Sequence, residues 1–195
     1  EHTFYYHTPN LIGISIHTGI GVGILINSQL YTGANGNAGE FGHSIIEPDG
    51  RPCPCGNSGC LEQYASERSI LKQFAALKGL EHADIDTFVA ACHKQDDDAL
   101  SLLDDFIRYM SYGINNLLNT FNPDMIVINS SFTTYFPEVL RQIQNRLQNR
   151  MRMHCILVPS GLQDTSILLG AACLCIRQFL GIQHLKLRKP PEKPF

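Results

Sequence analysis

The sequence predicts an α/β fold in which a mixed β-sheet is flanked by helices. Two β-rich runs open the chain, and two further short apolar runs follow later, at 124–130 and 155–160. Segments with helical spacing of apolar residues separate these later runs from each other and from the first pair. The chain of 195 residues is long enough for one domain of ordinary size with its own core.

The first two runs are "LIGISI" at 11–16 and "VGILIN" at 22–27. The glycine-rich stretch "HTGIG" lies between them and "NSQLYTG" follows, so we expect a hairpin-like strand pair with a turn at each end. Residues 33–60 are rich in glycine, proline and asparagine and are predicted to form a loop.

Three helices are expected next. Ser66 is a candidate N-cap for the first, and Asp84 or Asp86 for a short second one. Asp96, Asp97 and Asp98 precede a long helix, since acidic side chains favour the positive end of a helix. Its apolar stripe continues to Phe121, where Asn122-Pro123 ends the pattern.

The rest of the chain alternates strands and helices. Between the two later strands, 135–150 is predicted to be an amphipathic helix. The segment 165–180, "TSILLGAACLCIRQFL", is predicted to be a helix packed in the core. Residues 186–195 form a basic, proline-rich stretch that we expect to be a flexible tail, so the folded unit is assigned to 1–185.

Composition excludes several classes of protein. The net charge of -3 gives no electrostatic signal for nucleic acid, so any contact with DNA is expected from residues outside this chain. No apolar run reaches the roughly 18 residues that a membrane span needs, and no signal peptide is visible. We therefore predict a cytoplasmic protein without membrane contacts.

Seven cysteines are present, and an odd number argues against a disulfide framework. Four of them, Cys92, Cys155, Cys173 and Cys175, lie in apolar surroundings and are predicted to be small buried hydrophobic residues. The other three cluster in the spacing His43-x9-Cys53-x-Cys55-x4-Cys60.

This cluster is predicted to be a structural zinc site. Three thiolates and one imidazole complete a tetrahedral zinc shell and leave no position open for water. The prolines and glycines between the candidate ligands, His43, Cys53, Cys55 and Cys60, let the backbone bend around an ion. The alternative is a disulfide or uncoordinated thiols, although Cys53 and Cys55 are too close in sequence for an easy bridge.

The turn "HTGIGVG" at 17–23 resembles a phosphate-binding turn, with Thr18, Gly19 and Gly21 as candidate contacts. Many hairpins carry glycine for turn geometry alone, so this signal is weak by itself. The pattern is neither a Walker loop nor a dinucleotide fingerprint, because no Gly-Lys-Ser/Thr follows and the next element is a strand.

Three motifs in fixed order, the glycine hairpin, "GEFGH" and "CPCGNSGCLE", resemble the ROK family of repressors and sugar kinases over roughly residues 1–182. The resemblance implies an actin-like, ribonuclease-H-like lobe from the C-terminal part of a longer protein. It also implies sugar contacts by Glu40, His43 and Glu62, with His43 shared between sugar and zinc. The alternative is that Glu40 and Glu62 are solvated surface acids.

The chain departs from the family's kinases at three points. Their catalytic Asn-Asp pair is expected upstream of this chain, and no Asn-Asp dipeptide occurs in it. His17 replaces the first glycine of the kinases' Gly-Thr-Gly turn, and Asn129, Ser130 and Ser131 stand where a Gly-Gly pair is expected near adenosine. The imidazole of His17 is bulky where backbone should approach phosphate closely.

The favoured interpretation is therefore the effector-binding and oligomerising lobe of a sugar-responsive repressor, most similar to the family's xylose and N-acetylglucosamine types. Its expected partners are a sugar effector, a second copy in a dimer, and DNA through a helix-turn-helix domain outside this chain. The alternative is the C-terminal lobe of an ATP-dependent sugar kinase, so enzymatic activity stays open. A third possibility is a zinc-stabilised lobe with only a protein partner.

Overall fold

A computed structural model describes residues 8–147, 155–163 and 165–182. The described residues form a five-stranded mixed sheet in the order β3-β2-β1-β4-β5. β1 (Leu11–Ile16) lies at its centre, antiparallel to β2 (Ile20–Ile26) and parallel to β4 (Met125–Ser130). β3 (Gln29–Tyr31) and β5 (Ile156–Pro159) are the outer strands. The predicted α/β class with a mixed sheet is confirmed.

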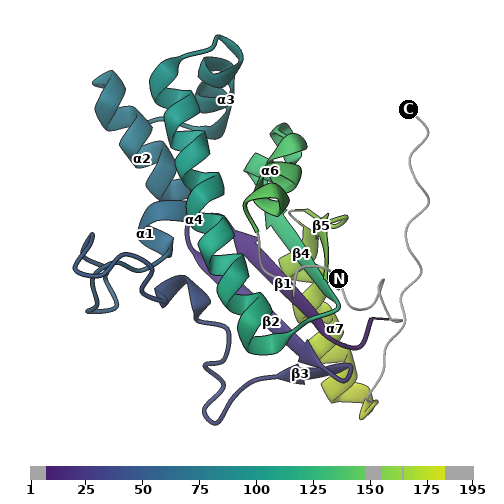
Figure 1. Cartoon of the computed structure of the whole chain (residues 1–195). Helices are drawn as coiled ribbons and strands as arrows, with labels where there is room; N and C mark the ends of the chain where they lie inside the picture. Colours follow the sequence, from purple (N-terminus) through teal and green to yellow (C-terminus); the bar gives the residue numbers. More distant parts are fainter. Residues whose placement is uncertain (1–7, 148–154, 164, 183–195) are drawn as a thin grey trace, which may run out of the picture.

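Helices cover one face of this sheet (Figure 1). The long helix α4 (Asp97–Phe121) crosses in front of the strands, and α6 (Glu138–Arg146) packs beside it. The shorter helices α1 (Glu62–Ala65), α2 (Glu67–Lys78) and α3 (Ile85–His93) contact α4 or one another, and α5 (Ser131–Tyr135) follows β4 directly.

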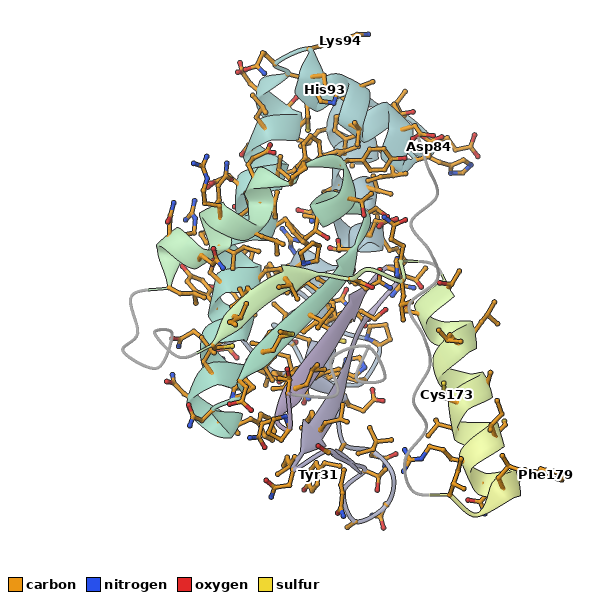
Figure 2. All side chains as sticks on the ribbon, turned by 90° about the vertical axis from the view of Figure 1, so that its right-hand side faces the viewer. Tyr31, Asp84, His93, Lys94, Cys173 and Phe179 are labelled. Atoms are coloured by element: carbon orange, nitrogen blue, oxygen red, sulfur yellow. The ribbon has the colours of Figure 1, made fainter. Side chains whose placement is uncertain are left out.

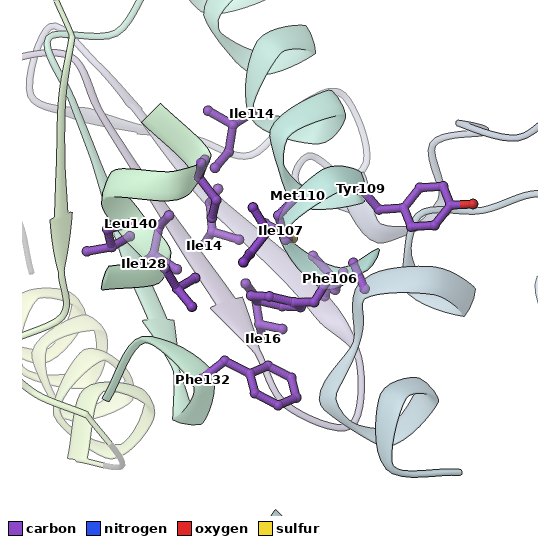
Figure 3. Packing of buried hydrophobic residues seen from close by; sticks show 14 of the residues in the cluster. Ile14, Ile16, Phe106, Ile107, Tyr109, Met110, Ile114, Ile128, Phe132 and Leu140 are labelled. Carbon is purple, nitrogen blue, oxygen red and sulfur yellow. The ribbon is translucent and has the colours of Figure 1, made fainter. Parts of the chain in front are cut away.

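The core lies between the strands and α4 (Figure 3). Alternate residues of the central strands point to this face, because side chains in a strand alternate between its two sides. Aromatic rings extend the core towards α3 and α5, with Phe106 and Phe132 centroids 4.6 Å apart. The buried residues that meet here from the strands and α4 include Ile14, Ile16, Phe106, Ile107, Met110, Ile114 and Ile128.

Three predicted helix starts are confirmed. The side chains of Ser66, Asp84 and Asp96 accept hydrogen bonds from backbone amides three residues later, at 3.1, 2.8 and 3.1 Å. Asn122 ends α4 in the left-handed conformation and donates its amide to the Leu118 carbonyl. Local side-chain hydrogen bonds therefore define the starts of α2, α3 and α4.

Some elements differ from the predictions. β2 begins at Ile20 instead of 22, because Ile16 pairs with Ile20 and the ladder continues to the tight turn. β3, α1 and α5 were not predicted, since three to five residues are too few for a periodic pattern. The helix predicted from 135 starts at Glu138, and 148–150 lie outside the described residues. The tail 186–195 also lies outside them.

The prediction that 165–180 packs in the core is wrong. This segment is helix α7 (Thr165–Leu180), but none of its residues is buried. Leu168 is 76% exposed and Phe179 is 90% exposed. Figures 1 and 2 show α7 behind the sheet, on the face opposite α4. In the described part of the chain, no helix is long and apolar enough to cross a membrane.

The composition of the sheet explains this position. The residues of β1 and β2 that alternate with the core positions include Gly13, Ser15, Gly21 and Gly23. These small residues offer a helix little apolar surface to bury. The prediction that four cysteines are buried holds only for Cys92. Cys155 and Cys173 are half-buried, and Cys175 is exposed.

Acid should weaken the contact between α2 and α4. Lys78 Nζ lies 2.7 Å from Asp96 and 2.6 Å from Asp98. Hydrogen bonding to Lys78 lowers the pKa of Asp96. A lowered folded-state pKa contributes stability that is present above the unfolded pKa of about 3.9 and lost as pH falls through the folded pKa. Asp96→Asn keeps the capping oxygen but removes the charge.

We predict that the gap in melting temperature between wild type and Asp96→Asn narrows as pH is lowered from about 5 to about 2. Asp97→Asn is the matched control, because Asp97 makes neither contact with Lys78. Thermal unfolding followed by circular dichroism checks this. A gap that stays constant over the acid range would contradict the assigned role of the Asp96 charge.

Candidate functional site

The loop between β3 and α1 gathers the four predicted metal ligands. The ligand atoms of His43, Cys53, Cys55 and Cys60 all lie within 4.8 Å of one another. His43 ends the short 3-10 turn Phe41–His43, and an isolated bridge pairs Ile45 with Cys60. A second bridge pairs Pro52 with Ser58, so the loop turns back on itself around Cys53 and Cys55.

A glycine makes this fold possible. Gly59 has a φ of +83°, and a side chain there would place its Cβ 1.7 Å from the Glu47 carbonyl oxygen. The Gly59 amide donates to the Arg51 carbonyl at 2.8 Å, while its own carbonyl accepts from Ile46. Glycine at this position therefore lets the chain turn sharply just before Cys60.

The donor set fits a metal ion that prefers sulfur and nitrogen. Cys53 Sγ lies 3.5 Å from His43 Nδ1, and Cys55 Sγ lies 3.7 Å from Cys60 Sγ, so neither pair is covalently bonded. Burial raises the pKa of Cys60 to about 12, whereas a hydrogen bond with the Asn57 backbone lowers the pKa of Cys55. A cation is what would hold the buried Cys60 as a thiolate.

Glu62 joins the loop to the glycine hairpin. Its Oε2 accepts a hydrogen bond from the Ile20 amide at 3.2 Å, and its Oε1 lies 3.5 Å from Arg68 Nη2. Its side chain is 13% exposed, so the alternative of a solvated surface acid does not describe this residue. A Cβ on Gly19 would lie 2.6 Å from Oε2, so glycine leaves the room that the carboxylate occupies.

Glu40 and His43 lie at the other side of Ile20. Gly42, between them, packs so closely on β2 that a Cβ there would lie 2.4 Å from the Ile20 carbonyl oxygen. His43 turns Nδ1 towards Cys53 and Nε2 towards Glu40, whose Oε2 is 3.8 Å away. Glu40 is 73% exposed, so its carboxylate is open to a ligand.

The carboxyl edge of the parallel strands is filled by polar contacts. Nε2 of His17, just after β1, lies 3.4 Å from Nδ2 of Asn129 near the end of β4. The same Asn129 amide donates to the Gln163 carbonyl at 3.1 Å and to Ser166 Oγ at 2.9 Å. Ser130 accepts from the Phe132 amide and caps α5. Thr18 and Gly21, in contrast, are exposed.

Several contacts of this region were not anticipated. Sequence reasoning missed Gln63 against Cys53, Arg68 against Glu62, and both Gln163 and Ser166 against Asn129. Gln63 and Arg68 lie on two different helices, because α1 ends at Ala65 and α2 begins after Ser66. A helical pattern in the sequence therefore does not join them. The Asn129 contacts join positions 34 and 37 residues apart, which no local motif encodes.

Comparison with known proteins places these features in context. Residues 5–178 match the model of the ROK family. The chain is 38% identical to a xylose repressor of Bacillus subtilis over 88% of this chain and 45% of the repressor. It is 33% identical to the DNA-binding transcriptional dual regulator NagC of Escherichia coli, over 88% of this chain and 46% of the regulator. The chain therefore spans less than half the length of these relatives.

Solved structures are similar as well. A ROK family glucokinase from Streptomyces griseus, in complex with glucose and AMPPNP, superposes with a TM-score of 0.76 at 28% identity, over 86% of this chain and 60% of that one. A ROK family transcriptional regulator, a homolog of the E. coli MLC protein, gives a TM-score of 0.67 at 31% identity, over 80% and 43%. The fold is thus shared by sugar kinases and regulators.

The close approach of Gly19 to Glu62 should contribute to the stability of the fold. Gly19→Ala should displace the Glu62 carboxylate from the Ile20 amide and cost about 1 kcal/mol, because a part-buried amide loses its acceptor. Gly21→Ala is the matched control: its added Cβ meets no atom within 4 Å. Urea denaturation of both variants measures the difference. Equal free energies of unfolding would show that the Glu62 contact contributes nothing.

Proposed function

The chain belongs to the ROK family, and we propose that it is the effector-binding and oligomerising lobe of a transcriptional repressor of sugar metabolism. The effector is a sugar, bound beside a zinc-stabilised loop. The likeness to a xylose repressor over 88% of this chain supports the repressor assignment. In the longer protein, a helix-turn-helix domain outside these residues contacts DNA, two copies form a dimer, and the protein acts in the cytoplasm.

One observation carries the choice of repressor over kinase. A nucleotide phosphate needs close approach to open backbone amides at a glycine turn. In this chain the His17 side chain contacts Asn129, which in turn holds Gln163 and Ser166 at the start of α7. These contacts occupy the strand edge where ligands of α/β sheets bind. These contacts support the proposal that the region holds α7 in place and does not admit ATP.

The sugar-binding role rests on three residues. Exposed Glu40 can accept hydrogen bonds from sugar hydroxyls, since a carboxylate offers two acceptor oxygens. Glu62 is fixed by the Ile20 amide and Arg68, so one edge of its carboxylate is already positioned. His43 presents Nε2 on the Glu40 side, where it can donate to a sugar oxygen.

Zinc would be held by His43, Cys53, Cys55 and Cys60, whose donor atoms the loop already brings together. Bound zinc would fix the orientation of the His43 ring, and Nε2, which faces Glu40, would then serve as a donor. The loop has few apolar anchors of its own, so the metal also contributes to its folding. We therefore assign the metal a structural role that supports the sugar pocket.

The mechanism is a shift between conformations. This lobe and the rest of the protein can adopt more than one relative orientation. A sugar that binds more tightly to one of these orientations shifts the population towards that orientation. In a dimer, such a change alters the spacing of the two DNA-reading heads, and half-site spacing determines operator binding. Binding of the sugar therefore releases the operator.

The second candidate is the C-terminal lobe of an ATP-dependent sugar kinase. The superposition on the glucokinase complex and the exposed turn with Thr18, Gly19 and Gly21 favour it. Both candidates share the sugar site but differ in turnover. Under the kinase hypothesis the base that activates the sugar hydroxyl lies outside this chain.

The test uses the intact protein. Its operator is first selected from fragments of its own genome, and release of that DNA is then followed by fluorescence anisotropy with xylose, glucose and N-acetylglucosamine. We expect one sugar to release the operator, Glu62→Gln to need at least about 10-fold more of it, and no sugar to support ADP formation from ATP. ADP formation that depends on a sugar would overturn the repressor assignment in favour of the kinase.

The metal assignment has its own test. Cys55→Ser removes one donor, so zinc content should fall from about one ion per chain to well below that, because each thiolate is part of a four-ligand shell. Cys92→Ser, a buried cysteine outside the cluster, is the control and should keep its zinc. Inductively coupled plasma mass spectrometry of purified proteins measures both. Unchanged zinc in Cys55→Ser would refute the ligand assignment.

A further inference from the structure

The amide side chain of Gln63 points at one of the cluster's sulfur atoms. Its Nε2 lies 3.5 Å from Cys53 Sγ, and the donor is the nitrogen. We propose that Gln63 is a positioning residue of the metal centre, which holds the Cys53 thiolate by an N–H···S hydrogen bond and protects it from attack. This inference rests on the metal assignment of the proposed function and names a residue outside the four ligands.

The backbone of Gln63 is held on both sides. Its amide donates to the Cys60 carbonyl at 3.0 Å. Its carbonyl accepts from Arg51 Nη1 at 2.9 Å and from Ser69 Oγ at 2.5 Å. These contacts come from the metal loop and from α2, so they fix the position of the Gln63 backbone beside Cys53.

The chemistry also fixes which end of the amide faces the sulfur. A thiolate that binds a metal carries no hydrogen and can only accept. The carboxamide must therefore present its N–H side, and its oxygen would be repelled. Such a donor draws charge from the sulfur, and contacts of this kind outside the ligand shell typically change metal affinity by about 10- to 100-fold.

The loop that contains Cys53 is also tied to α1 through Arg51. Cys53 is buried, with 7% of its surface exposed, so few water molecules can hydrogen-bond its sulfur and a donor from the protein matters more there. The Arg51 guanidinium, which binds the Gln63 carbonyl, also lies over the Tyr64 ring at 4.5 Å. The Tyr64 hydroxyl accepts from the Arg51 amide at 2.7 Å. Gln63 and Tyr64 together thus clamp α1 to the loop that contains Cys53.

Three variants of the intact protein separate hydrogen bonding from packing. Gln63→Glu keeps the shape but replaces the donor by a carboxylate, and Gln63→Leu removes polarity. Gln142→Leu is the matched control, because Gln142 is an exposed residue of α6, which packs against α4 and β5. A packing role predicts that Gln63→Glu resembles wild type. A donor role predicts that it is the weakest of the set.

Two readouts are used. Competition with a zinc chelator measures the affinity for zinc. This affinity should fall in the order wild type, Gln63→Leu, Gln63→Glu, with a difference of about 10-fold or more between wild type and Gln63→Glu. Reaction with iodoacetamide, in which sulfur displaces iodide, followed by peptide mass spectrometry should show Cys53 modified faster in both Gln63 variants. Gln142→Leu should match wild type in both readouts.

The outcomes are distinct. Gln63 variants that match zinc-loaded wild type in affinity and in Cys53 modification would overturn the inference and leave the metal assignment standing. A wild-type protein that binds no zinc would overturn both. Circular dichroism spectra establish that each variant is folded before comparison, and a Gln63→Glu variant that matches wild type while Gln63→Leu is weakened would assign the effect to packing and overturn the inference.

Discussion

The backbone of Ile20 is the point on which the candidate site depends. Its amide binds the Glu62 carboxylate, and its carbonyl packs against Gly42 between Glu40 and His43. Ile20 itself is the first residue of β2, paired with Ile16 at the end of the central strand. Both motif segments therefore take their position from one strand end, whose place is set by the sheet and by the buried side chain of Ile20.

This arrangement links the metal loop to the Glu62 carboxylate, the candidate sugar contact. The segment from Cys60 to Tyr64 contains a candidate zinc ligand, the carboxylate Glu62, the Cys53 contact Gln63 and the Arg51 contact Tyr64. A four-residue helix is too short to be stable by itself. It is stable here because the sheet and the loop hold it on both sides, so loosening the loop should disturb Glu62 as well.

Sequence reasoning succeeded where local chemistry decides and failed where distant parts meet. Ser66 was recognised as a cap, and the starts of the next two helices were located at Asp84 or Asp86 and at Asp96 to Asp98, because a helix start needs only residues of its own helix. The cluster of four candidate ligands could be predicted because their spacing is itself the signal. The burial of α7 was predicted wrongly, since apolar composition says that a helix avoids water but not what covers it. The contacts of Asn129 with His17 and Ser166 depend on the fold and leave no local pattern.

The proposed function requires that the metal loop supports sugar binding. The most direct test is calorimetric titration of the intact protein with the sugar that releases its operator, before and after zinc is removed by a chelator. We expect the affinity for the sugar to fall at least about 10-fold on removal of zinc, because His43 loses its fixed orientation, and added zinc to restore it. Equal affinity with and without zinc would contradict the claim and make the loop a purely structural feature.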